Sequence, residues 1–160
     1  MKKSLLSLLM YLLVARASAQ TQLPSVQLNT LHGTPVGSRA LLNDSVPIIL
    51  SFWSTTCGPC IEELNAFKSE WSKWQKVVRF KLVAVSTDDV RSLSKVRTVS
   101  TSRDWPFTVL IDKNQDFKRA LNVNVIPQLY VVSAKGNIVY SQIGYTPGGE
   151  EKILEVLKGL

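Results

Sequence analysis

The chain has 160 residues, of which 45% are hydrophobic and 19% charged, with two cysteines and one histidine. This length suits one domain with a single hydrophobic core. The formal net charge is +7, and three of the basic residues lie within the first 16 positions. The remaining mild basicity is typical of a solvated surface and does not indicate nucleic-acid binding. A structural zinc site needs four Cys or His ligands, and the chain has only three such residues, so no metal site is predicted.

Residues 1–19 have the features of a secretory signal peptide. A basic pair at residues 2–3 precedes a mostly apolar stretch over 5–15, and an A-x-A cleavage sequence ends at Ala19. The apolar stretch is shorter than the roughly 20 residues that span a bilayer. We therefore expect cleavage near Ala19, a periplasmic or otherwise exported location, and a single domain over 20–160. An uncleaved membrane anchor is the alternative.

Apolar periodicity over the rest of the chain predicts alternating strands and helices. The first half of the chain predicts a short hairpin within 26–36, a buried strand over 46–53, a helix after the cysteines through Trp74 and a strand over 80–85. A helix then begins at Asp88–Asp89 and ends in the polar stretch 98–102, and a strand over 107–111 follows it. The last elements are a short helix over 115–121, a hairpin of strands 129–132 and 138–141, and a helix within 147–159. Strands that alternate with helices pair in parallel, and a terminal hairpin adds antiparallel strands. The predicted fold class is α/β, a three-layer α/β/α sandwich with a mixed sheet and an N-terminal β-hairpin.

The two cysteines, Cys57 and Cys60, flank Gly58 and Pro59 where a predicted strand ends and a predicted helix begins. A C-x-x-C pair at such a junction indicates a thiol–disulfide redox centre. The free N–H groups and positive dipole end of the helix favour a thiolate at Cys57. A bridge that closes so short a loop restricts the unfolded chain little. Redox chemistry therefore explains the pair better than a structural disulfide does.

Two segments carry a family resemblance. Residues 52–60, FWSTTCGPC, resemble the active-site segment of thioredoxin, and Val125-Ile126-Pro127 before residues 128–132 resembles the cis-proline loop of that family. The order of elements and the predicted signal peptide look most like the exported TlpA/ResA-like branch. The match extends over about residues 23–160. It implies a thioredoxin fold and thiol–disulfide exchange, with no cofactor beyond the redox-active disulfide.

The resemblance also assigns roles to residues. Cys57 would be the exposed nucleophile and Cys60 the residue that resolves the mixed disulfide. Pro127 would be cis and lie against Cys57, and Ile126 would offer backbone groups to an extended substrate segment. An ordinary trans proline at the start of an edge strand is the alternative for Pro127. The implied substrate-binding surface comprises Trp53, Thr56, Gly58, Pro59, Ile126 and Pro127, with Trp53 at the rim as a fluorescence reporter of the redox state.

Three positions depart from the thioredoxin pattern. Ser51 stands where thioredoxins have a buried aspartate, Thr56 replaces the usual tryptophan, and Gln128 replaces the usual threonine. Glu63, one helical turn after Cys60, resembles a glutamate that TlpA/ResA-like reductases use in proton handling, and a carboxylate there could take the proton of Cys60. The alternative is that the acidic pair at 62–63 lies in the first turn and only complements the helix dipole.

The predicted function is that of an exported protein-disulfide reductase. It would take electrons from a membrane thiol donor and pass them to oxidised substrate proteins, in a role such as cytochrome c biogenesis, and act as a monomer. Gly-Pro between the cysteines resembles thioredoxin, with a potential of about −270 mV, more than a DsbA-type oxidant at about −120 mV. One alternative is a disulfide oxidase or isomerase, although no dimerisation domain is evident. The other is a non-enzymatic copper-binding module that would use both thiolates and His32, which is expected instead in a surface turn beside Gly33.

Overall fold

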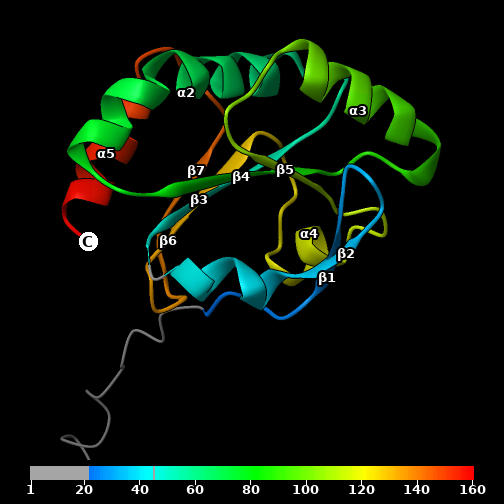
Figure 1. The fold of residues 1–160 in the computed structure, drawn as a ribbon, viewed down its shortest axis with the longest axis horizontal. Helices are drawn as coiled ribbons and strands as arrows, with labels where there is room; N and C mark the ends of the chain where they lie inside the picture. Colours follow the sequence, from blue (N-terminus) through cyan, green and yellow to red (C-terminus); the bar gives the residue numbers. More distant parts are fainter. Residues whose placement is uncertain (1–21, 45) are drawn as a thin grey trace, which may run out of the picture.

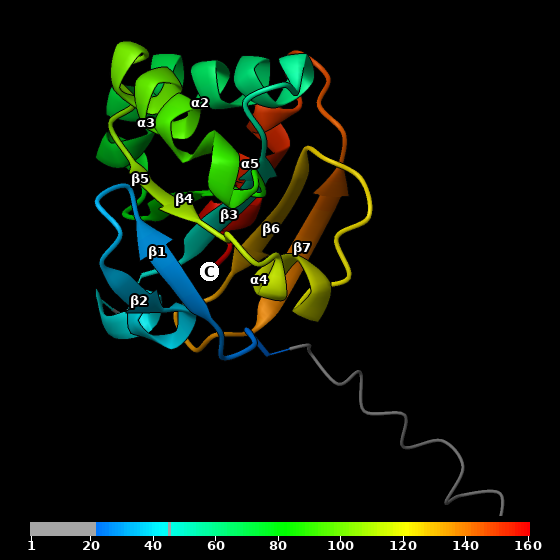
Figure 2. The ribbon, with the colours of Figure 1, turned by 90° about the vertical axis from the view of Figure 1, so that its right-hand side faces the viewer.

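A seven-stranded mixed sheet forms the centre of the computed structural model, which describes residues 22–44 and 46–160 (Figures 1 and 2). The strands lie in the order β2-β1-β5-β4-β3-β6-β7. Neighbours β3, β4 and β5 pair in parallel, and the remaining pairs are antiparallel. The strand bounds are β1 Gln27–Thr30, β2 Pro35–Gly37, β3 Ile48–Trp53, β4 Lys81–Ser86, β5 Thr108–Ile111, β6 Gln128–Val132 and β7 Ile138–Ile143.

Helices cover both faces of this sheet, as Figure 1 shows. Helices α2, α3 and α5 lie on one face, while α4 and the 3₁₀ helix η1 lie on the other. The bounds are η1 Ser38–Asp44, α2 Gly58–Val77, η2 Val90–Ser92, α3 Leu93–Ser102, α4 Asp116–Ala120 and α5 Glu150–Lys158. The predicted three-layer α/β/α sandwich is confirmed, and so is the N-terminal hairpin, which is formed by β1 and β2.

Strand β3 carries the active-site segment and lies between β4 and β6 near the middle of the sheet. All six of its side chains are buried, because helices cover both faces. Alternate side chains enter the two hydrophobic clusters: Ile49 and Trp53 pack on the α2 side, and Ile48, Leu50 and Phe52 pack on the α4 side. Ser51 shares the α2 face with Ile49 and Trp53, and this places its hydroxyl under the helix that holds the cysteines.

Helix α2 begins directly after Cys57, which is its N-cap residue, and Pro59 lies in its first turn. Proline suits this position because its missing N–H would have no helical partner there. The first turn contains no acidic residue. The expectation that residues 62–63 lie in that turn is therefore wrong, because the helix begins at Gly58 and places them in its second turn. This weakens the interpretation of Glu63 as a residue that only complements the helix dipole.

Helix α3 ends at Ser102, the last residue of the polar stretch in which its end was predicted. The hydroxyls of Thr98 and Thr101 donate to the carbonyls of Ser94 and Arg97, one turn back. These side chains are thereby satisfied within the helix and do not compete with its backbone hydrogen bonds. Buried contacts of Val96 and Ser100 hold this helix against the sheet.

Two expectations concern the chain ends and surface. The predicted signal peptide over residues 1–19 lies outside the described residues. In the part that is described, no helix combines the length and apolar character needed to cross a membrane. His32 lies exposed in the turn between β1 and β2, as predicted for a turn histidine.

Candidate active site

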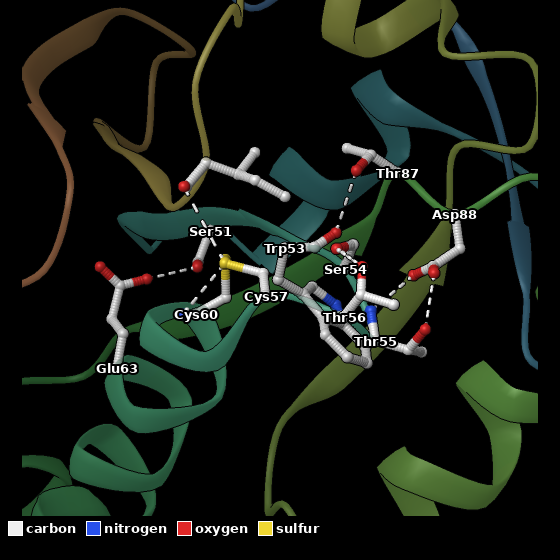
Figure 3. The surroundings of a disulfide bond; sticks show 11 residues. Ser51, Trp53, Ser54, Thr55, Thr56, Cys57, Cys60, Glu63, Thr87 and Asp88 are labelled. Carbon is white, nitrogen blue, oxygen red and sulfur yellow. Dashed lines mark hydrogen bonds between the residues drawn. A yellow bond between two sulfur atoms is a disulfide. The ribbon is translucent and has the colours of Figure 1, made fainter.

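Cys57 and Cys60 form a disulfide at the N-terminus of α2 (Figure 3). As the N-cap residue, Cys57 accepts a hydrogen bond at its sulfur from the backbone N–H of Cys60, at 3.3 Å. Cys57 is half-buried, whereas Cys60 is 0% exposed. An external thiol or disulfide can therefore reach Cys57 and not Cys60. The helix N-terminus also stabilises negative charge on the Cys57 sulfur once the disulfide is reduced.

The loop before β6 lies against the disulfide. The Ile126–Pro127 peptide bond is cis, as predicted. The carbonyl oxygen of Ile126 lies 3.9 Å from the sulfur of Cys57. This is a contact and not a hydrogen bond in the oxidised protein, because a disulfide sulfur carries no proton. The backbone N–H of Gly144 donates to the Pro127 carbonyl at 2.8 Å and ties the loop to the end of β7.

Glu63 is a buried carboxyl group under the same helix, with 2% of its surface exposed. The hydroxyl of Ser51 on β3 donates to its Oε2 at 2.6 Å (Figure 3). Burial raises the pKa of Glu63 from its ordinary 4.5 to about 7, while the Ser51 hydrogen bond lowers it and the negative charge of Glu150 raises it further. A carboxyl group that titrates near neutral pH is suited to give and take protons in catalysis. Ser51, which stands where thioredoxins have a buried aspartate, thus contacts the carboxylate of Glu63.

The predicted substrate-binding residues around Cys57 differ in their exposure. Thr56, Gly58 and Pro59 are exposed, Ile126 is half-buried and Pro127 is buried. The structure brings these predicted substrate-binding residues together around the disulfide, and their binding role stays a prediction. Gln128, the third departure from the thioredoxin pattern, is buried and donates to the carbonyl of Gln142 on β7 at 3.0 Å.

A family model described as the AhpC/TSA family matches residues 19–141 of the chain. The chain belongs to this family. The seven-stranded sheet, the C-x-x-C pair at the start of α2 and the cis-proline loop agree with membership in its thioredoxin-like branch.

Known relatives of this AhpC/TSA-family chain include redox proteins. It is 33% identical over 131 residues to the thioredoxin-like protein YneN of Bacillus subtilis, and the aligned region covers 77% of this chain and 70% of that protein. It is 25% identical over 121 residues to the thiol-disulfide oxidoreductase ResA of Bacillus cereus, over 76% of this chain and 67% of that protein. A solved thioredoxin-like protein from Porphyromonas gingivalis is 39% identical with a TM-score of 0.77, over 86% and 90% of the two chains. The resemblance to thioredoxin-like, ResA-related thiol–disulfide oxidoreductases is confirmed.

The side chain of Trp53 is less exposed than the family resemblance implied. It was expected at the rim of the site, but its side chain is 0% exposed. Strand alternation turns the indole to the α2 face, where it packs edge-on against Trp105 with ring centroids 5.1 Å apart. Its side chain therefore cannot contact a substrate at the surface, and its assignment as a substrate-binding residue is wrong. Its indole N–H has no hydrogen-bond partner.

Sequence reasoning offered Asp88 and Asp89 together as an N-cap for the helix after β4, and it missed the role of Asp88. Asp89 provides that cap, with its carboxylate accepting from the N–H of Arg91. The Asp88 carboxylate instead accepts hydrogen bonds from Thr55 and from the hydroxyl of Ser86. The sequence held one indication of this contact. Thr55 follows β3 and Asp88 follows β4, and the carboxyl ends of these neighbouring parallel strands meet at the same edge of the sheet.

Proposed function

We propose that this protein is an exported protein-disulfide reductase that works through the dithiol form of Cys57 and Cys60. The observation that carries the proposal is the asymmetry of the pair. Cys57 is accessible at the N-terminus of α2 beside the Ile126 carbonyl, while Cys60 is buried one turn before the buried carboxyl of Glu63. This arrangement suits a two-step exchange with one nucleophile and one resolving thiol.

In the first step the thiolate of Cys57 attacks one sulfur of the substrate disulfide. A mixed disulfide forms between Cys57 and the substrate, and the other substrate sulfur leaves as a thiolate that takes a proton from water. Helix α2 favours the attacking thiolate through its N-terminal dipole and the Cys60 N–H. Ile126 lies beside the reacting sulfur and offers backbone groups to an extended substrate segment.

In the second step the Cys60 thiol transfers its proton to the Glu63 carboxylate and attacks the Cys57 sulfur. The Cys57–Cys60 disulfide forms, and the second substrate sulfur leaves and is protonated. Two electrons have passed from the protein dithiol to the substrate. Burial holds the pKa of Glu63 at about 7, within reach of the ordinary thiol pKa of about 8.5, so this transfer is only mildly uphill. A membrane thiol donor would then restore the dithiol.

The reduction potential of the Cys57–Cys60 pair tests the direction of electron flow. The protein is equilibrated with defined thiol–disulfide buffers, and the fraction of dithiol is measured by alkylation and mass spectrometry. A potential near or below about −250 mV supports a reductase, whereas about −120 to −150 mV overturns the proposal and indicates an oxidant. Addition of copper(I) to the reduced protein tests the non-enzymatic alternative, which requires stoichiometric binding by both thiolates.

A further inference from the structure

A second carboxylate, that of Glu150, lines the same crevice as Glu63. Glu150 is the first residue of α5, and its Oε2 accepts hydrogen bonds from the Gly148 N–H at 3.0 Å and the Tyr145 hydroxyl at 3.5 Å. Glu63, Tyr145 and Glu150 line one narrow crevice, together with Phe67, Leu129, Gln142 and Ile153. The crevice leaves no room for a water molecule.

The polar and titratable groups around Glu63 come from several elements. Strand β3 contributes the neutral Ser51 hydroxyl, the segment after β7 contributes the neutral phenol of Tyr145, and α5 contributes the Glu150 carboxylate. On its own helix the neighbouring acid is Glu62, which is exposed. Among the described residues that line the crevice none is basic. An ionised Glu63 thus faces a negative charge and, among the described residues of the crevice, no cation, which opposes the loss of its proton.

The hydroxyl of Tyr145 is also surrounded by negative charge. Burial raises its pKa, and so do the negative charges of Glu150, Glu63 and Glu62. Its hydroxyl therefore stays protonated and remains a donor to Glu150. Two donors, one from the backbone and one from a phenol, hold the Glu150 carboxylate in place.

We propose that Glu150 is a positioning residue for the acid–base step, because its fixed carboxylate keeps the proton on Glu63 and makes the ionised Glu63 a stronger base toward the Cys60 thiol. This inference rests on the proposed function, in which Glu63 receives that proton. It gives α5 a part in the chemistry, although α5 contributes no atom to the disulfide. A purely structural role for Glu150 would be to complement the N-terminus of α5.

Titration of Glu63 in the whole protein separates the two roles. The carboxyl group is followed by NMR with ¹³C-labelled glutamate, and Glu63→Gln assigns its signal. We expect Glu150→Gln to move the Glu63 midpoint to lower pH, with at least about a threefold larger proton dissociation constant. Glu151→Gln is the matched control, since it removes an exposed charge from the same first turn of α5. It should leave the midpoint nearly unchanged.

An unchanged midpoint in Glu150→Gln overturns the inference, and so does an equal shift in Glu151→Gln. If the glutamine variant does not fold, Glu150→Ser removes the same charge with a residue that suits a helix start, and the same outcomes decide. The pH midpoint of mixed-disulfide resolution should follow the NMR midpoint downward in the Glu150 variant. The titration needs no substrate, so an oxidising potential would overturn the proposed function and leave the titration result standing.

Discussion

The carboxylate of Asp88 accepts two hydrogen bonds from Thr55, one from its backbone N–H at 3.0 Å and one from its hydroxyl at 2.7 Å (Figure 3). Thr55 lies two residues before Cys57, and Asp88 lies two residues after β4. Thr87 strengthens the same connection, because its N–H donates to the Trp53 carbonyl at 2.9 Å. The loop that presents the reactive cysteine is thus held by the end of the neighbouring strand.

Replacement of Asp88 by Asn should therefore loosen this loop. An amide can accept only part of the three hydrogen bonds that the carboxylate receives, and hydrogen bonds to charged groups are the stronger ones. We expect a loss of about 2 kcal/mol in the free energy of unfolding, measured with urea. Asp89→Asn is the control, since this exposed neighbour contacts only the η2 segment. Equal losses in the two variants would contradict the role of Asp88.

Glu63 should make the stability of the oxidised protein depend on pH. Its folded-state pKa of about 7 exceeds the ordinary 4.5, so the folded state holds this proton more tightly than the unfolded chain does. The resulting stabilisation is complete below about pH 4.5 and is lost as the pH rises through 7, a change of about 3 kcal/mol. Glu63→Gln should abolish this part of the pH dependence in urea unfolding between pH 4.5 and 8. The exposed Glu62→Gln should retain it, and parallel profiles for wild type and Glu63→Gln would refute the assignment.

The same variant should slow the second step of exchange. Without a carboxylate near Cys60, the thiol must lose its proton to solvent, and general-base catalysis commonly contributes about 100-fold. The rate of mixed-disulfide resolution, measured by stopped flow at pH 7, should fall by about that factor in Glu63→Gln. The rate at which iodoacetamide alkylates Cys57 in the reduced protein should change little. An unaltered resolution rate and pH profile would exclude Glu63 as the base.

Cysteine variants should show the different exposure of the two sulfurs. Cys60→Ser keeps the accessible nucleophile and removes the resolving thiol, so it should accumulate a mixed disulfide with an oxidised protein substrate. Cys57→Ser leaves only a sulfur that is 0% exposed and should form almost none. Mass spectrometry of the non-reduced products measures both. Equal trapping by the two variants would contradict the assignment of Cys57 as nucleophile.

Trp53 should report the redox state from inside the protein. Its indole belongs to the same buried cluster as Cys60, and sulfur near an indole changes its fluorescence. We expect a change of emission on reduction that disappears in Trp53→Phe and persists in Trp71→Phe. The cost in stability should be modest, about 1 kcal/mol, because phenylalanine also removes a buried N–H that has no partner. Identical emission of the oxidised and reduced wild-type protein would rule out this use of Trp53.

The sequence alone determined the order of the strands and α-helices and the location of the redox centre, although it did not indicate the 3₁₀ helix η1. Hydrophobic periodicity and turn residues act over a few neighbouring positions, so the β3–α2 junction at Cys57 and the hairpin of β6 and β7 could be predicted from local pattern. The cis bond at Pro127 followed from a family resemblance. The end of α3 at Ser102 also lies within the polar stretch that was expected to end this helix.

Only the tertiary structure decided which side chains meet. The Glu63–Ser51 contact requires α2 to pack on one face of β3, and the Asp88–Thr55 contact depends on the register of β3 and β4. Trp53 is buried because β3 lies between covered faces; the apolar run over 46–53 indicated burial, while the family resemblance suggested a position at the rim. Contacts between residues distant in the chain arise from the packing of whole elements, and the proton affinity of Glu63 is set by that packing through burial and the approach of α5.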